Sequence, residues 1–107
     1  SLKDSVIREM REETGLIISN PKLCGIKDWI REDGTRYLVL LYKTDEFTGE
    51  LKSSEEGKVF WVERENFSSL NPIWNLNELM EIYETDDFFE FFFAFKDGKY
   101  EDGTLVG

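Results

Sequence analysis

The feature that most constrains the fold is Tyr37–Tyr42, a run of six apolar residues with no polar interruption. Alternating apolar and polar residues are typical of a strand with one solvated face, whereas an unbroken apolar run is typical of a strand buried on both faces. Glu32, Asp33 and Gly34 give a hairpin signal before this run, and Leu23–Trp29, which also indicates a strand, lies on the other side of that turn. The run therefore predicts a strand that is buried on both faces of a sheet.

A helix is predicted over residues 1–14, because apolar side chains recur there at spacings of three and four and Gly15 supplies a C-terminal stop. We expect no N-cap at the start of this helix. The other expected elements are a strand at Leu16–Ile18, a turn at residues 19–21, a polar loop at Asp45–Ser54, a strand at Lys58–Val62, a helix at Asn75–Thr85 with Asn75 as its N-cap, a strand or helix extension at Phe88–Phe95, and a mobile tail.

The composition excludes several classes of protein. The chain of 107 residues has no histidine, one cysteine and a formal net charge of −10. Without histidine, its chemistry must rest on carboxylates, Lys, Tyr, Ser, Thr or the single thiol of Cys24. One cysteine excludes a disulfide framework and fits a reducing cytoplasm. A strongly acidic chain lacks the basic surface that binding to a nucleic-acid polymer needs, and no apolar stretch approaches the ~20 residues of a membrane span.

Acidic residues concentrate near the end of the first predicted helix. At 100° per residue, Glu9, Glu12 and Glu13 fall at about 180°, 120° and 220°, which is a single arc. The apolar residues of this helix span about 200° to 340°, so Glu13 is expected inside the core-facing sector and Glu9 at its edge. Gathered carboxylates repel one another and lose hydration unless a positive charge lies among them. A hard divalent cation such as Mg²⁺ would supply that charge, because it takes oxygen ligands from a few carboxylates.

The alternative is a solvated helix face held by pairs such as Arg8–Glu12, each worth ~0.3–0.5 kcal/mol. The pattern is more specific than such a face requires. Residues Arg8–Leu16 read Arg-Glu-apolar-any-Glu-Glu-any-Gly-apolar, and a chance match to these seven fixed positions has a probability on the order of 10⁻⁵ for this chain. This segment closely resembles the second half of the Nudix box, whose full form begins with Gly, five residues, Glu and seven residues. Ser1–Ile7 would be those seven spacer residues.

The resemblance implies an α/β (α+β) fold, the Nudix α/β/α sandwich with a mixed sheet. Residues 1–107 would be the C-terminal two thirds of one such domain, with the box helix at residues 1–15, strands at about 16–62, a helix at about 75–85 and the aromatic segment at 88–95. The first Gly and Glu of the box and the N-terminal strands would precede Ser1. We therefore expect an exposed sheet edge, association of two copies through it as a homodimer, and weak or absent hydrolysis by the chain alone.

By the same resemblance, Glu9, Glu12 and Glu13 would be ligands of Mg²⁺ or Mn²⁺, and one of them would position the attacking water. Arg8 would orient the glutamates through a salt bridge, and Gly15 would permit the turn out of the helix. These residues are the expected catalytic group, and they need no histidine, because a metal ion lowers the pKa of its bound water.

Further site residues are expected downstream. Many Nudix hydrolases supply another glutamate from a loop just before a strand, and Glu56 is preferred here over Glu55 as that metal ligand. The alternative is that both are solvated loop acids. Trp74 and Asn75 are candidate contacts to a purine base, and the alternative for them is a core anchor followed by an N-cap.

The family implies a Mg²⁺-dependent enzyme that hydrolyses nucleoside diphosphate derivatives, with water attacking phosphorus. Leu23–Val62 is also similar to bacterial MutT-type proteins, which implies conversion of 8-oxo-dGTP or another (d)NTP to a monophosphate and pyrophosphate in the cytoplasm. The alternatives are hydrolysis of ADP-ribose or a nucleotide sugar, and a non-catalytic Nudix module that senses a ligand. Such sensors often lose box glutamates, and all three are present here.

Overall fold

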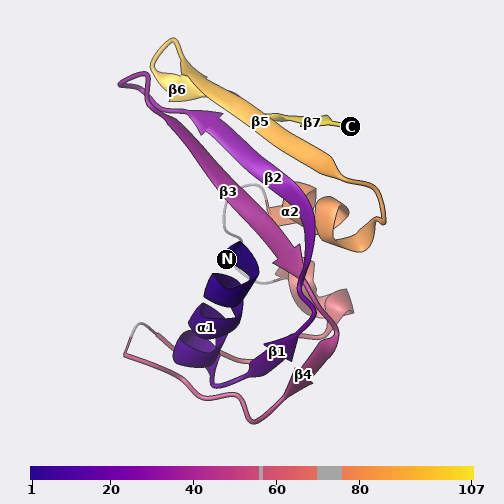
Figure 1. Cartoon of the computed structure of the whole chain (residues 1–107). Coiled ribbons are helices and arrows are strands. Elements are labelled where there is room, and N and C mark those ends of the chain that lie inside the picture. Colours follow the sequence, from indigo (N-terminus) through magenta and orange to yellow (C-terminus); the bar gives the residue numbers. More distant parts are fainter. Residues whose placement is uncertain (56, 70–75) are drawn as a thin grey trace. The chain divides into compact units, whose positions relative to one another are not determined.

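The structure is a computed structural model that describes residues 1–55, 57–69 and 76–107 (Figure 1). Its contacts form two compact units, which are described separately: unit 1 comprises Ser1–Lys22 and Lys43–Asn71, and unit 2 comprises Leu23–Tyr42 and Pro72–Gly107. In the described part of the chain, no helix is both long enough and apolar enough to cross a membrane. A single domain over residues 1–107 stays a prediction.

Unit 1 contains a helix that packs beside a two-stranded antiparallel sheet (Figure 1). The sheet pairs β1 with β4, with Ile18 opposite Phe47. Leu16 and Ile18 are its buried apolar side chains. The elements of unit 1 are α1 (Leu2–Thr14), β1 (Ile17–Ser19), β4 (Glu46–Thr48) and the 3₁₀ helix η1 (Arg64–Ser69).

Unit 2 is built on a mixed sheet of five strands (Figure 1). The strand order is β3-β2-β5-β6, and β7 also pairs with β5. The β2–β5 pairing is parallel and the pairings of β5 with β6 and β7 are antiparallel. The elements of unit 2 are β2 (Lys22–Ile30), β3 (Arg36–Lys43), α2 (Leu76–Glu84), β5 (Phe89–Lys96), β6 (Lys99–Tyr100) and β7 (Thr104–Val106).

The core of unit 2 lies between α2 and one face of this sheet. Its most deeply buried apolar side chains are Ile82 on α2 and Phe91 on β5, both fully buried. The periodicity of α2 places Leu79 and Tyr83 against the same cluster. Alternate residues of β5 point to one face, so the aromatic run supplies a row of rings to the core and leaves the intervening residues for the other face.

Gly25 on β2 allows α2 to approach the sheet closely. A Cβ atom at this position would lie 2.5 Å from Ile82 Cγ2 and 2.7 Å from the backbone oxygen of Phe89. We expect Gly25→Ala to destabilise the chain by about 1–3 kcal/mol, because the backbone oxygen cannot rotate away as a side chain can. Urea unfolding followed by circular dichroism measures this loss.

Gly34→Asn is the matched control for that substitution. Gly34 lies in the β2–β3 turn with φ +85°, a Cβ atom there would have open space within 4 Å, and Asn tolerates the left-handed region. We expect this control to change stability by less than about 1 kcal/mol. Equal losses for the two variants would contradict the packing role of Gly25.

Several sequence predictions about single elements are confirmed. The first helix, its stop at Gly15, the β2–β3 hairpin and the second helix are present. The aromatic segment, for which a strand and a helix extension were both open, is the strand β5. The expected absence of an N-cap is wrong, because the Ser1 hydroxyl accepts a hydrogen bond from the Asp4 N–H at 3.2 Å. The N-cap assigned to Asn75 lies outside the described residues.

Predictions that depend on distant pairing were less accurate. The run at residues 37–42 is a strand, but only Leu41 is buried, because β3 has β2 as its sole neighbour among the described strands. Lys58–Val62 is not a strand in the described structure, since it has no pairing partner there. The expected loop at Asp45–Ser54 contains β4, and the expected mobile tail contains β6 and β7, which pair with β5. Among the described strands β3 lies at one end of the strand order, and a homodimer through an exposed edge stays a prediction.

Candidate active site

The candidate catalytic residues lie on α1, which is a surface helix of unit 1. Val6, Ile7 and Met10 form its half-buried stripe, and none of its residues is fully buried. The Ser1 cap and the Gly15 stop bound the helix at its two ends. This placement leaves most of the helix circumference to solvent and therefore to polar side chains.

The C-terminal end of α1 is held by a dense set of hydrogen bonds. Gly15 has φ +81°, and its N–H donates to the oxygen of Arg11 at 2.9 Å. The hydroxyl of Thr14 donates to the oxygen of Met10 at 2.5 Å, and the backbone oxygen of Thr14 accepts from the Lys52 N–H at 2.6 Å. The last turn of the helix is therefore bonded to the segment that follows β4.

Only glycine fits at position 15. Its positive φ already disfavours a side chain, and a Cβ atom would lie 2.7 Å from the backbone oxygen of Glu50. The sequence predicted that Gly15 permits the turn out of the helix, and the geometry of this turn agrees with that role. The close approach of the segment around Glu50 is a second requirement that the sequence alone did not indicate.

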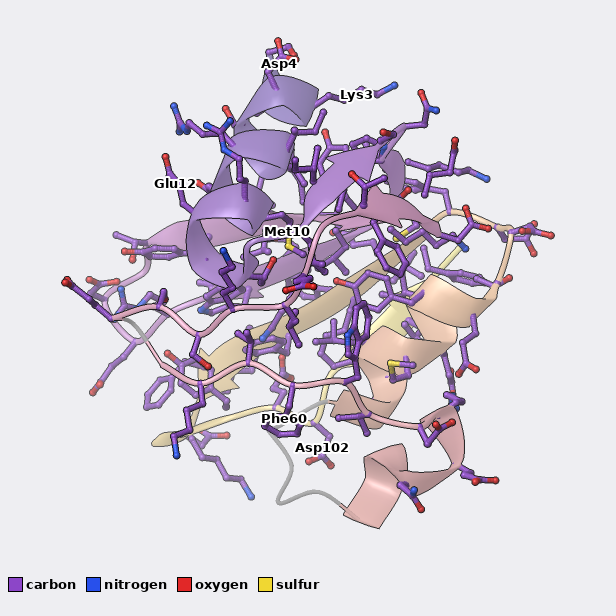
Figure 2. All side chains as sticks on the ribbon, turned by 90° about the horizontal axis from the view of Figure 1, so that it is seen from below. Lys3, Asp4, Met10, Glu12, Phe60 and Asp102 are labelled. Atoms are coloured by element: carbon purple, nitrogen blue, oxygen red, sulfur yellow. The ribbon has the colours of Figure 1, made fainter. Side chains whose placement is uncertain are left out.

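The three motif glutamates are all exposed on α1. Arg8 and Glu12 form an ion pair one helical turn apart, with Arg8 Nε 3.9 Å from Glu12 Oε1 and both side chains about 60% exposed. Figure 2 shows Glu12 projecting outward from the helix, away from Met10. The prediction that Glu13 lies inside the core-facing sector is wrong, because the half-buried stripe of α1 is narrower than the apolar arc of its sequence. The desolvation cost that was expected from this burial therefore does not arise.

The donor chemistry of α1 fits a hard divalent cation, because exposed carboxylates on one side of a helix supply oxygen ligands that are free to rotate. Among the described residues, however, no group of three carboxylates is close enough to hold a metal ion. Glu56 lies outside the described residues, whereas Glu55 is exposed. The metal-ligand roles of Glu9, Glu12, Glu13 and Glu56 therefore stay predictions.

The base-contact candidates Trp74 and Asn75 also lie outside the described residues. Unit 2 has another row of aromatic rings, in which Trp29 stacks at 5.5 Å on Tyr37 and at 5.7 Å on Phe93. Lys27 Nζ lies 5.1 Å from the centre of the Trp29 ring. Because both neighbours of Trp29 already stack on it, this row stabilises three adjacent strands and leaves little ring face for a ligand.

A shallow hollow of about 250 Å³ lies at the end of the β2–β3 hairpin. It is lined by Arg31, Glu32, Asp33 and Tyr100. The guanidinium of Arg31 donates to the hydroxyl of Tyr37 at 2.9 Å and lies over its ring at 4.8 Å. Because two carboxylates accompany one guanidinium, the lining does not favour an anion such as a phosphate.

Sequence reasoning missed a charged cluster on the sheet of unit 2, formed by Asp28, Arg36 and Glu90. Asp28 is 2% exposed, and its two carboxylate oxygens accept hydrogen bonds from Arg36 at 2.9 and 2.8 Å. The signal for this cluster was present as single carboxylates inside two apolar strands, KLCGIKDWI and FEFFFAFK. Isolated acids in such strands are rarely buried without a charged partner.

Comparison with known proteins finds similarities to this chain in sequence and in structure. No protein-family model matches it. An uncharacterised Nudix hydrolase of Bacillus subtilis (strain 168), YvcI, is 41% identical over 81 residues, which are 71% of this chain and 48% of that protein. The crystal structure of the MutT mutator protein from Bacillus halodurans has a TM-score of 0.78 and 27% identity, and the match covers 98% of this chain and 73% of that one.

The mixed sheet with its helices is therefore the α/β fold of Nudix proteins. In sequence the chain is similar to a Nudix hydrolase, and among solved structures it is similar to a MutT-type protein. It spans about half the length of the curated relative that it matches. Its motif helix and its glycine stop agree with this similarity.

Proposed function

We propose that the protein is a divalent-metal-dependent pyrophosphohydrolase that acts on nucleoside diphosphate derivatives. The observation that carries the proposal is the Arg8–Leu16 motif on one surface helix, with Arg8 paired to Glu12 and Gly15 in the left-handed stop. A helix with these carboxylates exposed and its end anchored can present them to a metal ion and a phosphate. Nudix relatives in sequence and in structure support the same class of enzyme.

In this proposal the chain's own residues have separate roles. Glu9, Glu12 and Glu13 would hold Mg²⁺ or Mn²⁺, with Glu56 as a further ligand. A bound ion would neutralise phosphate charge, and it would lower the pKa of its bound water molecule toward neutral pH. Arg8 would orient Glu12 through their ion pair, and one of the three helix carboxylates would accept the proton of the attacking water.

The substrate that we propose is 8-oxo-dGTP or a related (d)NTP, which would be converted to the monophosphate and pyrophosphate. The support is the likeness to a structure described as a MutT mutator protein, together with the MutT-like stretch Leu23–Val62. Trp74 and Asn75 are the proposed contacts to the base. The formal net charge of −10 argues for a small nucleotide rather than a nucleic-acid polymer as the partner.

A substrate panel on the full-length protein with Mg²⁺ tests this proposal. The panel contains 8-oxo-dGTP, dGTP, ADP-ribose and a nucleotide sugar, and pyrophosphate release is measured separately from phosphate release. We expect pyrophosphate release, with 8-oxo-dGTP preferred to dGTP. Turnover of ADP-ribose alone would overturn the substrate while keeping the class of enzyme. Nucleotide binding without turnover of any member would instead favour a ligand-sensing Nudix module.

We also propose that the protein acts in the cytoplasm, where the nucleotide pool lies. The thiol of Cys24 is 4% exposed and donates a hydrogen bond to the backbone oxygen of Leu41 at 3.2 Å. A buried, reduced cysteine suits a reducing compartment. This use of Cys24 in the core also argues against a role for it in catalysis.

A further inference from the structure

Three neighbouring strands of unit 2 each contribute one charged side chain to the same face of the sheet. β2 supplies Asp28, β3 supplies Arg36 and β5 supplies Glu90. In the parallel β2–β5 register, Glu90 lies opposite Ile26 and Asp28 opposite Phe92, so the two acids are diagonal neighbours on adjacent strands. Diagonal neighbours on one face of a sheet lie within reach of each other's long side chains, so the carboxyl of Glu90 can reach that of Asp28.

The charges in this cluster do not balance when both acids are ionised. Arg36 occupies both oxygens of Asp28, at 2.9 and 2.8 Å, and its one positive charge faces two carboxylates. Asp28 is 2% exposed, whereas the side chain of Arg36 is 59% exposed. Two carboxylates that share a hydrogen bond need a proton between them, because an ionised carboxylate can only accept.

No other charged group of the described strands compensates for this deficit. Lys27 precedes Asp28 on β2 and lies over the rings of Trp29 and Phe93, which belong to the opposite face. On β7, the residue opposite Glu90 is Val106, which carries no charge. The titratable and charged groups that act on the pair are therefore Arg36 and the two acids themselves.

We propose that Asp28 and Glu90 share one proton, and that this proton is a pH-sensitive lock between the strands β2 and β5. With the proton in place, the carboxyl of Glu90 donates to Asp28 while Arg36 neutralises Asp28. When the proton leaves, two carboxylates on adjacent strands face one guanidinium and repel each other. The lock acts on β5, whose Phe91 is a fully buried side chain of the core.

The directions of the pKa shifts agree with this assignment. The hydrogen bonds from Arg36 hold the pKa of Asp28 below its ordinary value, although burial opposes them. The hydrogen bond to Asp28 raises the pKa of Glu90. A raised folded-state pKa means that the stabilisation from Glu90 is present at low pH and is lost as the pH rises through that pKa. The lock is therefore closed between the lowered pKa of Asp28 and the raised pKa of Glu90, and it opens as the pH rises above the latter.

Glu90→Gln tests the lock, because the amide keeps a donor toward Asp28 and removes the charge. We expect this variant to raise the Tm at about pH 8 by about 3–5 °C, and we expect the gain to shrink as the pH falls through the raised pKa of Glu90, where the parent regains its proton. Glu81→Gln is the matched control, since Glu81 is an exposed carboxylate of α2 and its replacement changes the net charge equally. We expect the control to shift the Tm by less than about 1 °C across this pH range.

Equal Tm shifts for the two variants would overturn the proposal, and so would a gain from Glu90→Gln that does not depend on pH. A carbon-NMR titration of the side-chain carboxyls provides a second readout. It should show Glu90 titrating above the ordinary pKa of a glutamate carboxyl, and a midpoint at or below that ordinary value would overturn the shared proton. This inference does not rest on the proposed enzymatic activity, because all of its readouts measure stability or titration.

Discussion

Glu12→Gln should lower kcat for nucleotide hydrolysis by about 10²–10⁴-fold in the full-length protein. The proposed role of Glu12 depends on its negative charge, which the amide lacks although it has the same shape. The side chain of Glu12 is 61% exposed, and its contact in the structure is the 3.9 Å ion pair with Arg8. Because an exposed pair of this kind is worth only ~0.3–0.5 kcal/mol, we expect the Tm to be almost unchanged. A loss of kcat without a loss of Tm therefore separates chemistry from folding.

Asp4→Asn is the matched control for this experiment. Asp4 is an exposed carboxylate on the first turn of the same helix. It lies outside the motif and carries no role in the proposed chemistry. We expect the kcat of the Asp4→Asn protein to stay within about twofold of the parent value. A Glu12→Gln variant with parental kcat would contradict the proposed function of the helix.

Arg36→Met should destabilise the chain by about 2–3 kcal/mol at neutral pH. The substitution leaves Asp28 ionised at 2% exposure without the two hydrogen bonds that now neutralise it. Removing one partner of a fully buried pair costs about 3–5 kcal/mol. We expect the smaller loss of about 2–3 kcal/mol here, because the side chain of Arg36 is 59% exposed and water can enter its place. Urea unfolding monitored by circular dichroism gives the free energy of unfolding for both chains.

The pH dependence of this loss has a definite sign. Because Arg36 lowers the pKa of Asp28, its stabilisation is present above the ordinary carboxyl pKa and disappears as the pH falls through the lowered value. The gap between the parent and Arg36→Met should therefore narrow in acid. Arg31→Met is the control, since Arg31 binds the Tyr37 ring and hydroxyl rather than a buried acid, and we expect it to cost less than about 1 kcal/mol. Equal losses for the two arginines would contradict the role of Asp28.

Local signals in the sequence predicted the elements whose structure depends on near neighbours. The α1 helix follows from apolar spacing and ends where Gly15 allows a positive φ. The β2–β3 hairpin follows from Gly34, which also has a positive φ, in a turn closed by a 2.9 Å hydrogen bond from the Arg31 N–H to Thr35. In each case a few adjacent residues carry the whole physical cause.

The errors concern elements whose state depends on residues far away in the chain. The Tyr37–Tyr42 run has the composition of a buried strand, yet its burial is set by how many strands flank it, and β3 is flanked by β2 alone among the described strands. Lys58–Val62 has β-forming residues but no partner in the described structure, and β-propensity without a partner does not form a strand. The partner of β4 is β1, which is too distant in sequence for a pattern to reveal.

The candidate site likewise contains features that depend on near neighbours and features that depend on distant residues. The sequence motif alone predicted that Glu9, Glu12 and Glu13 share one helix. Their angular positions on that helix did not predict that all three are exposed. Asp28, Arg36 and Glu90 come together only because the sheet places β2 between β3 and β5. Nothing in the sequence indicates that strand order, so the single acids in the two apolar strands could signal a buried charge but not which residues it would meet.

The anchored end of α1 has a consequence for how this chain can change in length. Gly15 and Gly49 approach each other closely enough that a Cβ at Gly49 would lie 3.1 Å from the Gly15 oxygen, and Lys52 bonds to Thr14 in the same region. An insertion between Gly49 and Lys52 would therefore disrupt the hydrogen bond from Lys52 to Thr14 and the close packing at Gly15, which together hold the C-terminal end of α1. Around Gly34, by contrast, the space beside the backbone is open, so loop extensions in related chains should accumulate at that hairpin and avoid residues 49–52.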